Sequence, residues 1–333
     1  MKRQPGVAII GCGLIGKKRA KALGPARLIA CSDMVSSRAQ DLAAAAPGAT
    51  AQTDWRTVIE HPEVDIVIVA TTVAAAPAIT MAAVKAGKHV LVEKPAARDP
   101  RELAPVMEAA GRSRVLVRVG FNHRYHAAML KAFQLYRDGA LGEMMFVRGR
   151  YGHGGRIGYE REWRADPRLS GGGELIDQGV HLIDLSRMFL GEFTVVCGFA
   201  HTYFWNMPVD DNGFMLLKTE KQQTAFLHVS CTEWKNLFSF EIYGKKAKLQ
   251  IDGLGGSYGV EKLTYYKMLP QMGPPETVLW EFPGGDESWA NEFMEFLEDI
   301  RLHRQPSAGL ADANAALSVV EKIYQGSGYD HNA

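Results

Sequence analysis

Short apolar runs alternate with helical stretches over the first 120 residues. Each run is continuously apolar rather than alternating, which is typical of strands covered on both faces of a parallel sheet. The runs cover residues 7–10, 28–32, 64–71, 89–92 and 115–120. Alanine-rich stretches at 17–23, 37–46, 77–86 and 100–110 separate them and predict helices. This series predicts an α/β fold with a doubly wound parallel sheet of the Rossmann type.

The pattern changes after residue 121. A helix is predicted at 127–136, a strand at 144–151, and a second helix after the glycines at 171–173. Beyond Gly191, long β-segments separated by short turns predict an antiparallel sheet, and two amphipathic helices follow at 286–303 and 310–325. We therefore expect two domains, an N-terminal dinucleotide-binding domain at 1–121 and a C-terminal α/β domain at 122–333.

The first turn of the chain fits two kinds of phosphate-binding loop. Gly11 to Lys17 matches most of a P-loop, but the next residue is Lys18, where a P-loop needs a Ser or Thr to bind Mg²⁺. Gly11, Gly13 and Gly16 match G-x-G-x-x-G, follow the first strand and open a helix, so a pyrophosphate could sit on that helix N-terminus. The sequence therefore predicts a dinucleotide site.

An acidic residue ends the second strand. Asp33 is placed to accept hydrogen bonds from a ribose diol, and its charge would repel the 2′-phosphate of NADP, so NAD is the expected cofactor. Arg38 follows five residues later and could pair with a phosphate, which keeps NADP possible; alternatively it is an ordinary solvated helix residue.

Composition excludes several classes of partner. The 38 basic and 37 acidic side chains nearly balance, so no global field would attract nucleic acid or an anionic membrane. No apolar run approaches the roughly 20 residues of a membrane helix. The four cysteines are scattered without a C-x-x-C pair, which favours reduced thiols and a cytoplasmic location.

Candidate catalytic groups lie in two places. Asp177, His181 and Asp184 are spaced four and three apart and share one face of a regular helix, where the imidazole could take a hydroxyl proton. Such a His could instead be structural, or could bind a metal with Asp177, but no third ligand follows at a suitable spacing, so no metal is expected. Lys94, after a parallel strand, could stabilise a developing alkoxide, or be a solvated lysine.

Three stretches carry a family resemblance. "AGKHVLVEKP" (86–95), "VGFNHRY" (119–125) and "GGGELIDQGVHLIDLSRMFLGE" (171–192) resemble the glucose-fructose oxidoreductase / inositol dehydrogenase / MocA family. The resemblance implies a C-terminal domain with an open, mostly antiparallel sheet that binds substrate and forms a homodimer or homotetramer. It also implies that the peptide bond before Pro95 is cis.

The same resemblance implies roles for individual residues. His181 would be the general acid/base, Lys94 its partner on the substrate side, and Asp177 a ligand of a substrate hydroxyl, whereas Asp184 would be structural. The implied cofactor contacts are Gly11, Gly13, Leu14, Ile15, Gly16, Asp33, Arg38, Thr71, Thr72, Glu93, Lys94 and Asn122. One departure concerns residues 72–78, "TVAAAPA", where many relatives carry Pro, Asn and His. Beyond the two threonines, this segment offers only backbone to the nicotinamide ribose.

Basic and aromatic residues crowd the loop at 150–170. The predicted substrate contacts in this loop are Arg156, Tyr159, Trp163 and Arg164, and the resemblance adds Arg124 beside Lys94, Asp177 and His181. Such a cluster suggests an anionic or large substrate, such as a nucleotide-linked sugar or a sugar acid. Alternatively, the arginines pair with Glu160, Glu162 and Asp166 and only order the loop.

The motifs together predict an NAD(P)-dependent oxidoreductase. Hydride would pass between nicotinamide and a secondary hydroxyl, or ketone, of a sugar, a sugar derivative or a cyclitol. A second hypothesis is that tightly bound NAD serves a closed redox cycle for hydrolysis or epimerisation. A third is a sensor that binds dinucleotide without turnover, although a sensor has no need of a proton acceptor.

Overall fold

The computed structural model describes residues 3–329, and these fall into two compact units. The first extends to Phe121 and also includes Trp289–Asn314, whereas the second comprises Asn122–Ser288 and the residues from Ala315 onward. The chain thus passes between the units three times, after residues 121, 288 and 314. Each unit is described separately below.

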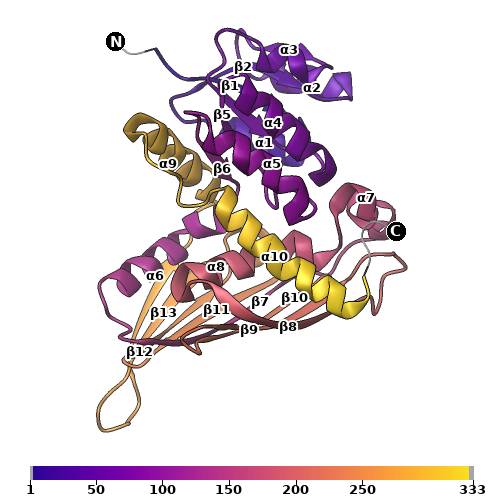
Figure 1. Ribbon diagram of the computed structural model, residues 1–333. Helices are drawn as coiled ribbons and strands as arrows, with labels where there is room; N and C mark the ends of the chain where they lie inside the picture. The colour runs from indigo at the N-terminus through magenta and orange to yellow at the C-terminus, as the bar shows by residue number, and fades with distance from the viewer. Residues whose placement is uncertain (1–2, 330–333) are drawn as a thin grey trace. The chain divides into compact units, whose positions relative to one another are not determined.

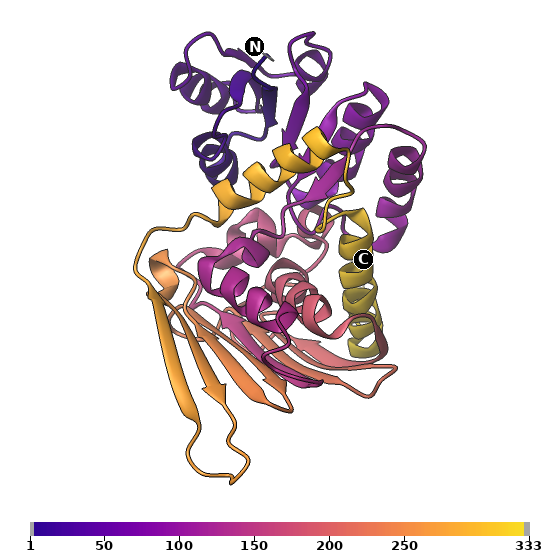
Figure 2. The same ribbon diagram turned by 90° about the vertical axis from the view of Figure 1, so that its left-hand side faces the viewer.

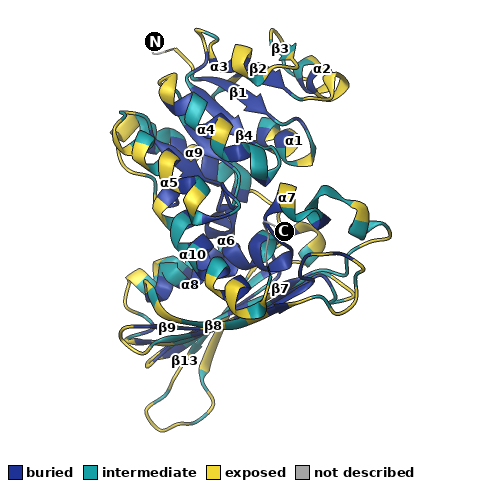
Figure 3. Cartoon of the chain, turned by 45° about the vertical axis from the view of Figure 1, so that its right-hand side comes forward, coloured by how far each residue is buried: buried dark blue, intermediate teal, exposed yellow. Residues whose placement is uncertain are grey.

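The first unit is built on a six-stranded parallel sheet with the order β3-β2-β1-β4-β5-β6. Its strands are β1 (Gly6–Ile10), β2 (Arg27–Ser32), β3 (Thr50–Gln52), β4 (Ile66–Val69), β5 (His89–Val92) and β6 (Val117–Val119). The central strands β1, β4 and β5 are almost wholly buried, as their continuous apolar runs predict (Figure 3). The doubly wound Rossmann-type sheet is confirmed.

Helices connect these strands. They are α1 (Leu14–Lys21), α2 (Ser36–Ala44), α3 (Trp55–Ile59), α4 (Ala76–Lys85) and α5 (Pro100–Gly111), with a 3₁₀ turn η1 (Val73–Ala75) before α4. Side-chain caps begin two of them, because Asp54 accepts the amide hydrogen of Arg56 and Asp99 accepts those of Arg101 and Glu102. The pattern of apolar runs missed the short elements β3 and α3.

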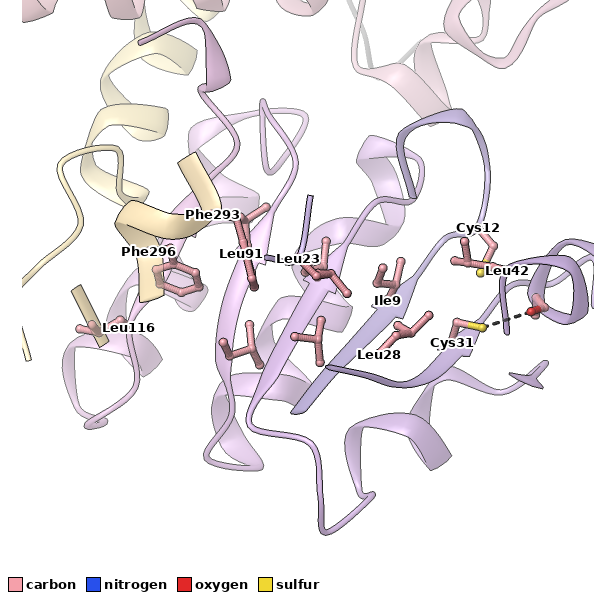
Figure 4. Close-up of a cluster of buried hydrophobic side chains, with 14 residues drawn as sticks. Ile9, Cys12, Leu23, Leu28, Cys31, Leu42, Leu91, Leu116, Phe293 and Phe296 are labelled. Atoms are coloured by element: carbon pink, nitrogen blue, oxygen red, sulfur yellow. Dashed lines mark hydrogen bonds between the residues drawn. The ribbon is translucent and has the colours of Figure 1, made fainter. Parts of the chain in front are cut away.

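Helix α9 (Ser288–Leu302) packs with the first unit. Phe293 and Phe296 enter the same buried cluster as Ile9 and Leu91 (Figure 4). The domain division predicted at 121/122 assigned this helix to the C-terminal domain, and the structure corrects that assignment. Its amphipathic pattern showed that one face is buried, but gave no information about which sheet it covers.

The second unit is built on an eight-stranded sheet with the order β14-β13-β12-β11-β7-β10-β9-β8. The strands are β7 (Met144–Gly152), β8 (Phe193–His201), β9 (Asn212–Thr219), β10 (Thr224–Ser230), β11 (Leu237–Gly244), β12 (Ala247–Asp252), β13 (Glu261–Lys267) and β14 (Glu276–Phe282). Only β7 and β10 pair in parallel; the other neighbours are antiparallel. The mostly antiparallel sheet is confirmed, and β13 and β14 extend it beyond the predicted strands.

Helices cover one face of this sheet. They are α6 (Ala127–Arg137), α8 (Val180–Leu190) and the later part of α10 (Leu310–Ser327), while the short helix α7 (Pro167–Ser170) lies in the loop before α8. Figure 1 and Figure 2 show α6 and α8 on the same side of the strands. No helix in residues 3–329 combines the length and apolarity needed to cross a bilayer.

Candidate active site

The three glycines of the first turn have different surroundings. A Cβ on Gly16 would lie 2.0 Å from the carbonyl oxygen of Gly11, and one on Gly11, which has φ +93°, would lie 2.2 Å from that of Ala70. These two glycines are therefore required by packing. A Cβ on Gly13 would meet nothing within 4 Å, although Gly13 caps α1. The space at Gly13 is what the backbone of a pyrophosphate cradle needs.

Asp33 lies beside this turn. Its Oδ2 accepts the amide hydrogen of Cys12 at 2.8 Å, and its Oδ1 accepts that of Val35 at 2.9 Å. The carboxylate therefore ties the end of β2 to the glycine turn, where it would meet an adenosine ribose. Arg38 follows Asp33 by five residues, and its side chain is exposed in the first turn of α2.

The remaining predicted cofactor contacts in the first unit lie at the ends of its strands and at the start of α1. Leu14 is exposed and Ile15 half-buried in the first turn of α1. Thr71 and Thr72 follow β4 and are half-buried, and the hydroxyl of Thr71 donates to the carbonyl of Thr72 at 3.2 Å. The segment after Thr72, which departs from the Pro, Asn and His of many relatives, forms the 3₁₀ turn η1. This turn leads directly into α4.

The Glu93-Lys94-Pro95 motif follows β5. The Lys94–Pro95 peptide bond is cis, as the resemblance implies, and Lys94 is half-buried. The carboxylate of Glu93 accepts from Nε of Arg19 at 2.6 Å, and Nη1 of Arg19 donates to Glu292 at 2.6 Å. Glu93 thus holds a buried arginine, and its predicted contact with the cofactor stays a prediction. Sequence reasoning missed Arg19 and Glu292, because no local pattern links residues so far apart.

In the second unit, the candidate catalytic helix is irregular. Asp177 lies in a π-helical turn, η5 (Leu175–Gly179), and His181 lies in the first turn of α8. The prediction of one regular helix is therefore incorrect at this point, and π-turns of this kind are frequent at functional sites. His181 is 3% exposed and Asp184 1% exposed, whereas the side chain of Asp177 is 23% exposed.

Asp210 holds the start of this helix. Its carboxylate accepts the amide hydrogens of Gly173 at 2.9 Å and Leu175 at 2.7 Å, and the hydroxyl hydrogen of Tyr324 at 2.6 Å. Burial raises the pKa of Asp210 to about 6, although these three hydrogen bonds oppose the shift. Sequence reasoning missed Asp210, which lies in an irregular loop without a motif.

His181 packs among other rings. The ring centroids of His123 and His181 lie 3.7 Å apart, and Tyr151 contacts both imidazoles. His123 belongs to the "NHR" stretch after the last Rossmann strand, but its own role was not predicted. The packing fixes the plane of the His181 ring, as a positioned proton acceptor requires.

Asn122 and Arg124 have partners within the second unit. The amide of Asn122 donates to the hydroxyl of Ser288 at 2.8 Å. Arg124 forms a two-point ion pair with Asp184, in which Nε lies 2.7 Å from Oδ2 and Nη2 donates to Oδ1. The structure thus gives Arg124 a structural contact, while its predicted contact with substrate and that of Asn122 with the cofactor stay predictions. Asp184 is held as a buried ion-pair partner.

The loop at 150–170 is largely ordered by its own charges. Arg156 pairs with Glu162 at 2.6 Å, Arg161 lies 3.5 Å from Glu160, and Arg168 lies 3.2 Å from Asp166. These pairs match the alternative in which the loop arginines neutralise nearby acids. They leave less positive charge for an anionic substrate than the sequence suggested.

Arg164 is different, because its partner lies on the candidate catalytic helix. Its Nε is 3.2 Å from Oδ2 of Asp177, and its guanidinium lies over the ring of Trp163. Tyr159 joins the same helix, since its hydroxyl donates to Glu174 at 2.8 Å. The structure therefore brings Arg164, with Trp163 against it, to Asp177, and brings Tyr159 to Glu174 just before the π-turn.

His153 also contacts Glu174, with Nε2 at 3.2 Å from Oε1. Burial lowers the pKa of His153, but the hydrogen bond and the charge of Glu174 outweigh it, so the pKa is raised. Glu174 itself is 1% exposed. Among residues 3–329, no three His, Cys, Asp or Glu side chains are grouped to hold a metal ion.

A Rossmann unit with an open glycine turn and a second α/β unit built on a mostly antiparallel sheet define a class of two-unit dinucleotide-binding folds. Comparison with family models is specific. Residues 6–121 match the Gfo/Idh/MocA oxidoreductase family with an NAD-binding Rossmann fold, and residues 129–250 match the C-terminal domain of the same family. The two models together cover most of the chain, and the protein belongs to this family.

Curated relatives include dehydrogenases from bacteria. Levoglucosan dehydrogenase of Pseudarthrobacter phenanthrenivorans is 29% identical over 64% of this chain and 58% of its own. Inositol 2-dehydrogenase 2 of Saccharopolyspora erythraea is 32% identical over 64% and 63%. These two matches span less than two thirds of either relative. The scyllo-inositol 2-dehydrogenase (NAD(+)) of Bacillus subtilis is 25% identical over 96% of this chain and 93% of its own.

Solved structures share the fold along nearly the whole chain. Levoglucosan dehydrogenase in complex with NADH and levoglucosan has a TM-score of 0.88 at 22% identity, covering 98% of both chains. Its complex with NADH and L-sorbose has a TM-score of 0.86 at 22% identity, covering 97% of this chain and 98% of the other. At this identity the likeness shows the fold alone.

Proposed function

We propose that the protein is an NAD-dependent dehydrogenase that transfers hydride between nicotinamide and a secondary hydroxyl, or the matching ketone, of a sugar or cyclitol. Two observations carry the proposal. The first is the buried His181, which begins α8 directly after the π-turn that carries Asp177. The second is the open glycine turn of the other unit, with Asp33 at its side. The names of the curated relatives, which are levoglucosan and inositol dehydrogenases, support this substrate class.

The residues present fit the cofactor. Gly13 and the backbone of α1 would hold the pyrophosphate, and Asp33 would hold the adenosine ribose. When bound, the nicotinamide ring supplies the hydride acceptor at its C4. Because Asp33 would repel a 2′-phosphate, NAD is expected to bind more tightly than NADP.

The remaining chemistry comes from side chains. His181 accepts the proton of the substrate hydroxyl as the C–H bond of the same carbon is cleaved, and returns it in ketone reduction. The Lys94 ammonium donates a hydrogen bond to that oxygen and stabilises its developing negative charge. Asp177, oriented by Arg164 at 3.2 Å, accepts a hydrogen bond from a neighbouring hydroxyl and so selects polyols.

A neutral substrate fits this site better than a strongly anionic one. Arg156, Arg161 and Arg168 already face acidic neighbours in their own loop. Binding a phosphate or carboxylate would require breaking these pairs or adding a second anion to them. We therefore place free or glycosidic sugars and cyclitols ahead of nucleotide-linked sugars and sugar acids.

The first test is absorbance at 340 nm with NAD⁺, and separately NADP⁺, against cyclitols, neutral sugars, sugar acids and nucleotide sugars. NADH formation with neutral polyols, larger with NAD⁺ than with NADP⁺, supports the proposal. Product formation without accumulation of NADH would instead indicate the closed redox cycle. Binding of NAD without any product across the panel would favour the sensor hypothesis.

We also propose that two or four copies associate through the open face of the sheet, in the cytoplasm. Val195, Phe199, Leu216 and Phe226 on β8, β9 and β10 are 47–69% exposed on that face. A patch of this kind on a sheet is typical of a subunit interface. The mass in solution should exceed that of one chain, and Leu216→Glu should lower it. An unchanged mass for this variant would contradict the proposed interface.

A further inference from the structure

A buried arginine connects three parts of the first unit. Arg19 lies on α1, and its side chain is fully buried. Its Nε donates to Oε1 of Glu93 at 2.6 Å, and its Nη1 donates to Oε2 of Glu292 at 2.6 Å. Its guanidinium also lies over the ring of Trp289, 4.5 Å from the centroid. Arg19 thus joins α1 to the residue after β5 and to α9.

The burial of these charges demands a precise geometry. The side chains of Arg19 and Glu292 are 0% exposed and that of Glu93 is 13% exposed. Charges taken out of water are stabilised only by close and well-directed partners. A guanidinium can meet two carboxylates at once because its N–H groups form a rigid planar fork, whereas an ammonium is a single point charge. The three side chains therefore hold one another in one arrangement.

The backbone of Glu93 is fixed as well as its side chain. Its amide donates to the carbonyl of Val69 at 2.9 Å, and its carbonyl accepts the amide hydrogen of Ala96 at 3.0 Å. With its carboxylate on Arg19, Glu93 is held at its amide, its carbonyl and its side chain. Lys94 is the next residue, so its side chain starts from a fixed point.

Gly120, directly after β6, makes room for this ion pair. A Cβ on Gly120 would lie 2.8 Å from Nη2 of Arg19 and 2.9 Å from Oε2 of Glu93. Its φ lies outside the left-handed region, so glycine is needed here for space and not for backbone conformation. Any side chain at this position would press on the pair.

We propose that Arg19 is a positioning residue for Lys94. Arg19 lies on the helix that Gly13 caps, whose N-terminus would hold the pyrophosphate of the cofactor. By holding Glu93, it ties the backbone of Lys94 to that helix, so the Lys94 ammonium and the bound cofactor keep one spacing. The inference rests on the proposed function, which places Lys94 at the reacting oxygen. The alternative is a purely structural arginine that only fixes α9 to the sheet.

The experiment is a double-mutant cycle between Arg19 and Lys94. Arg19→Lys keeps the charge but removes the fork, so kcat/KM for the most active neutral polyol of the 340 nm panel should fall by about tenfold or more, mainly through kcat. The affinity for NAD should stay within about threefold, because the glycine turn and Asp33 are unchanged. In the Lys94→Ala background the same substitution should change kcat/KM by less than about twofold, since no ammonium is left to position. Equal losses in both backgrounds would overturn the inference.

Arg118 provides a matched control within the same unit. Its side chain is also fully buried, and it pairs with Asp299 on α9, but it lies on β6 rather than on α1. Arg118→Lys should lower the melting temperature as Arg19→Lys does, because each variant disturbs a buried contact with α9. Any effect of Arg118→Lys on kcat/KM should be the same with and without Lys94. A loss confined to the background with Lys94 would show that the cycle reports general damage to the unit.

Gly120→Ala gives a second variant that changes no charge, and it replaces Arg19→Lys if that protein does not fold. Its Cβ meets only the ends of two side chains, Nη2 of Arg19 and the carboxylate of Glu93, so the pair is displaced while the backbone is kept. We expect a severalfold loss of kcat/KM that again disappears in the Lys94→Ala background. A loss of the same size in both backgrounds would contradict the positioning role.

Labelling of lysine amines with acetic anhydride tests the position of Lys94 without any turnover. Lys94 is half-buried, so its release in Arg19→Lys should raise its acetylation rate severalfold relative to the exposed Lys85, whereas Arg118→Lys should leave this ratio unchanged. Mass spectrometry measures both rates. If no polyol is oxidised but the ratio changes as expected, the proposed reaction fails and the positioning role stands. If polyols are oxidised while Arg19→Lys changes neither the ratio nor kcat/KM, the reaction stands and the positioning role fails.

Discussion

The guanidinium of Arg124 pairs at two points with the carboxylate of Asp184, one helical turn beyond His181. Both side chains are at least nine-tenths buried, so the pair fixes the start of α8 to the segment that follows the Rossmann sheet. A buried charge without its partner is costly, because neither water nor a counter-ion reaches it. The pair therefore helps to position the segment that carries His181, and the predicted contact of Arg124 with substrate stays a prediction.

Arg124→Ala should lower the free energy of unfolding by about 3–5 kcal/mol, because Asp184 is left buried with its charge uncompensated. The double variant Arg124→Met, Asp184→Leu should recover most of this loss. As a control, Arg156→Ala removes an exposed pair with Glu162 and should cost less than about 1 kcal/mol. Urea unfolding measures all three, and a similar cost for Arg124→Ala and Arg156→Ala would contradict the assignment.

The glycine turn allows binding and folding to be separated. Gly13→Ala should leave the melting temperature nearly unchanged, because its Cβ meets open space, but should weaken NAD binding by an order of magnitude or more. Gly16→Ala should lower the melting temperature, because its Cβ would lie 2.0 Å from a backbone oxygen. Calorimetric titration with NAD and thermal melts test both variants. Tight NAD binding by Gly13→Ala would show that the cofactor does not approach this position.

The sequence predicted well what is local. The glycine turn and Asp33 lie within 23 residues of one βαβ unit, and their order on strand, turn and helix follows from the spacing alone. The parallel sheet could be predicted because continuous apolar strands are buried on both faces. The family motifs supplied His181, Lys94 and Asp177, whose roles stay predictions.

The sequence could not predict contacts between distant segments. Arg19 and Glu292 are 273 residues apart, and nothing in either neighbourhood indicates a buried ion pair. Asp210 caps a helix that begins 35 residues earlier, from a loop without a motif. The π-turn at Asp177 was missed for another reason, since π-turns are rare and the sequence was interpreted with the period of a regular α-helix throughout.

The raised pKa of Asp210 predicts a pH dependence of stability. The folded state binds this proton with a pKa of about 6, against 3.8 for an ordinary aspartate, so it holds more protons than the unfolded state between these values. Stability from this group is therefore complete below pH 4 and lost as the pH rises through 6, by about 3 kcal/mol. Urea unfolding between pH 4.5 and 7.5 measures the slope.

Two variants check the Asp210 prediction. Asp210→Asn cannot titrate, so its stability relative to the wild type should increase as the pH rises through this window. Tyr324→Phe removes a hydrogen bond that lowers the pKa of Asp210, and should shift the upper end of the window to higher pH. Parallel curves for wild type and Asp210→Asn would show that another group controls the dependence.

Variants of His181, the proposed proton acceptor, and of Lys94, its partner, should have different kinetic effects. His181→Ala should lower kcat by about 10²–10⁴, because no other group takes the hydroxyl proton, while the affinity for NAD changes little. Lys94→Ala should lower kcat/KM by a similar factor, since the ammonium acts on the oxygen as its charge develops. Gln178→Ala, on the same π-turn, is a matched control and should retain activity within a fewfold. Stopped-flow measurement of NADH formation separates hydride transfer from product release. An unchanged hydride-transfer rate in both His181→Ala and Lys94→Ala would remove these residues from the chemical step.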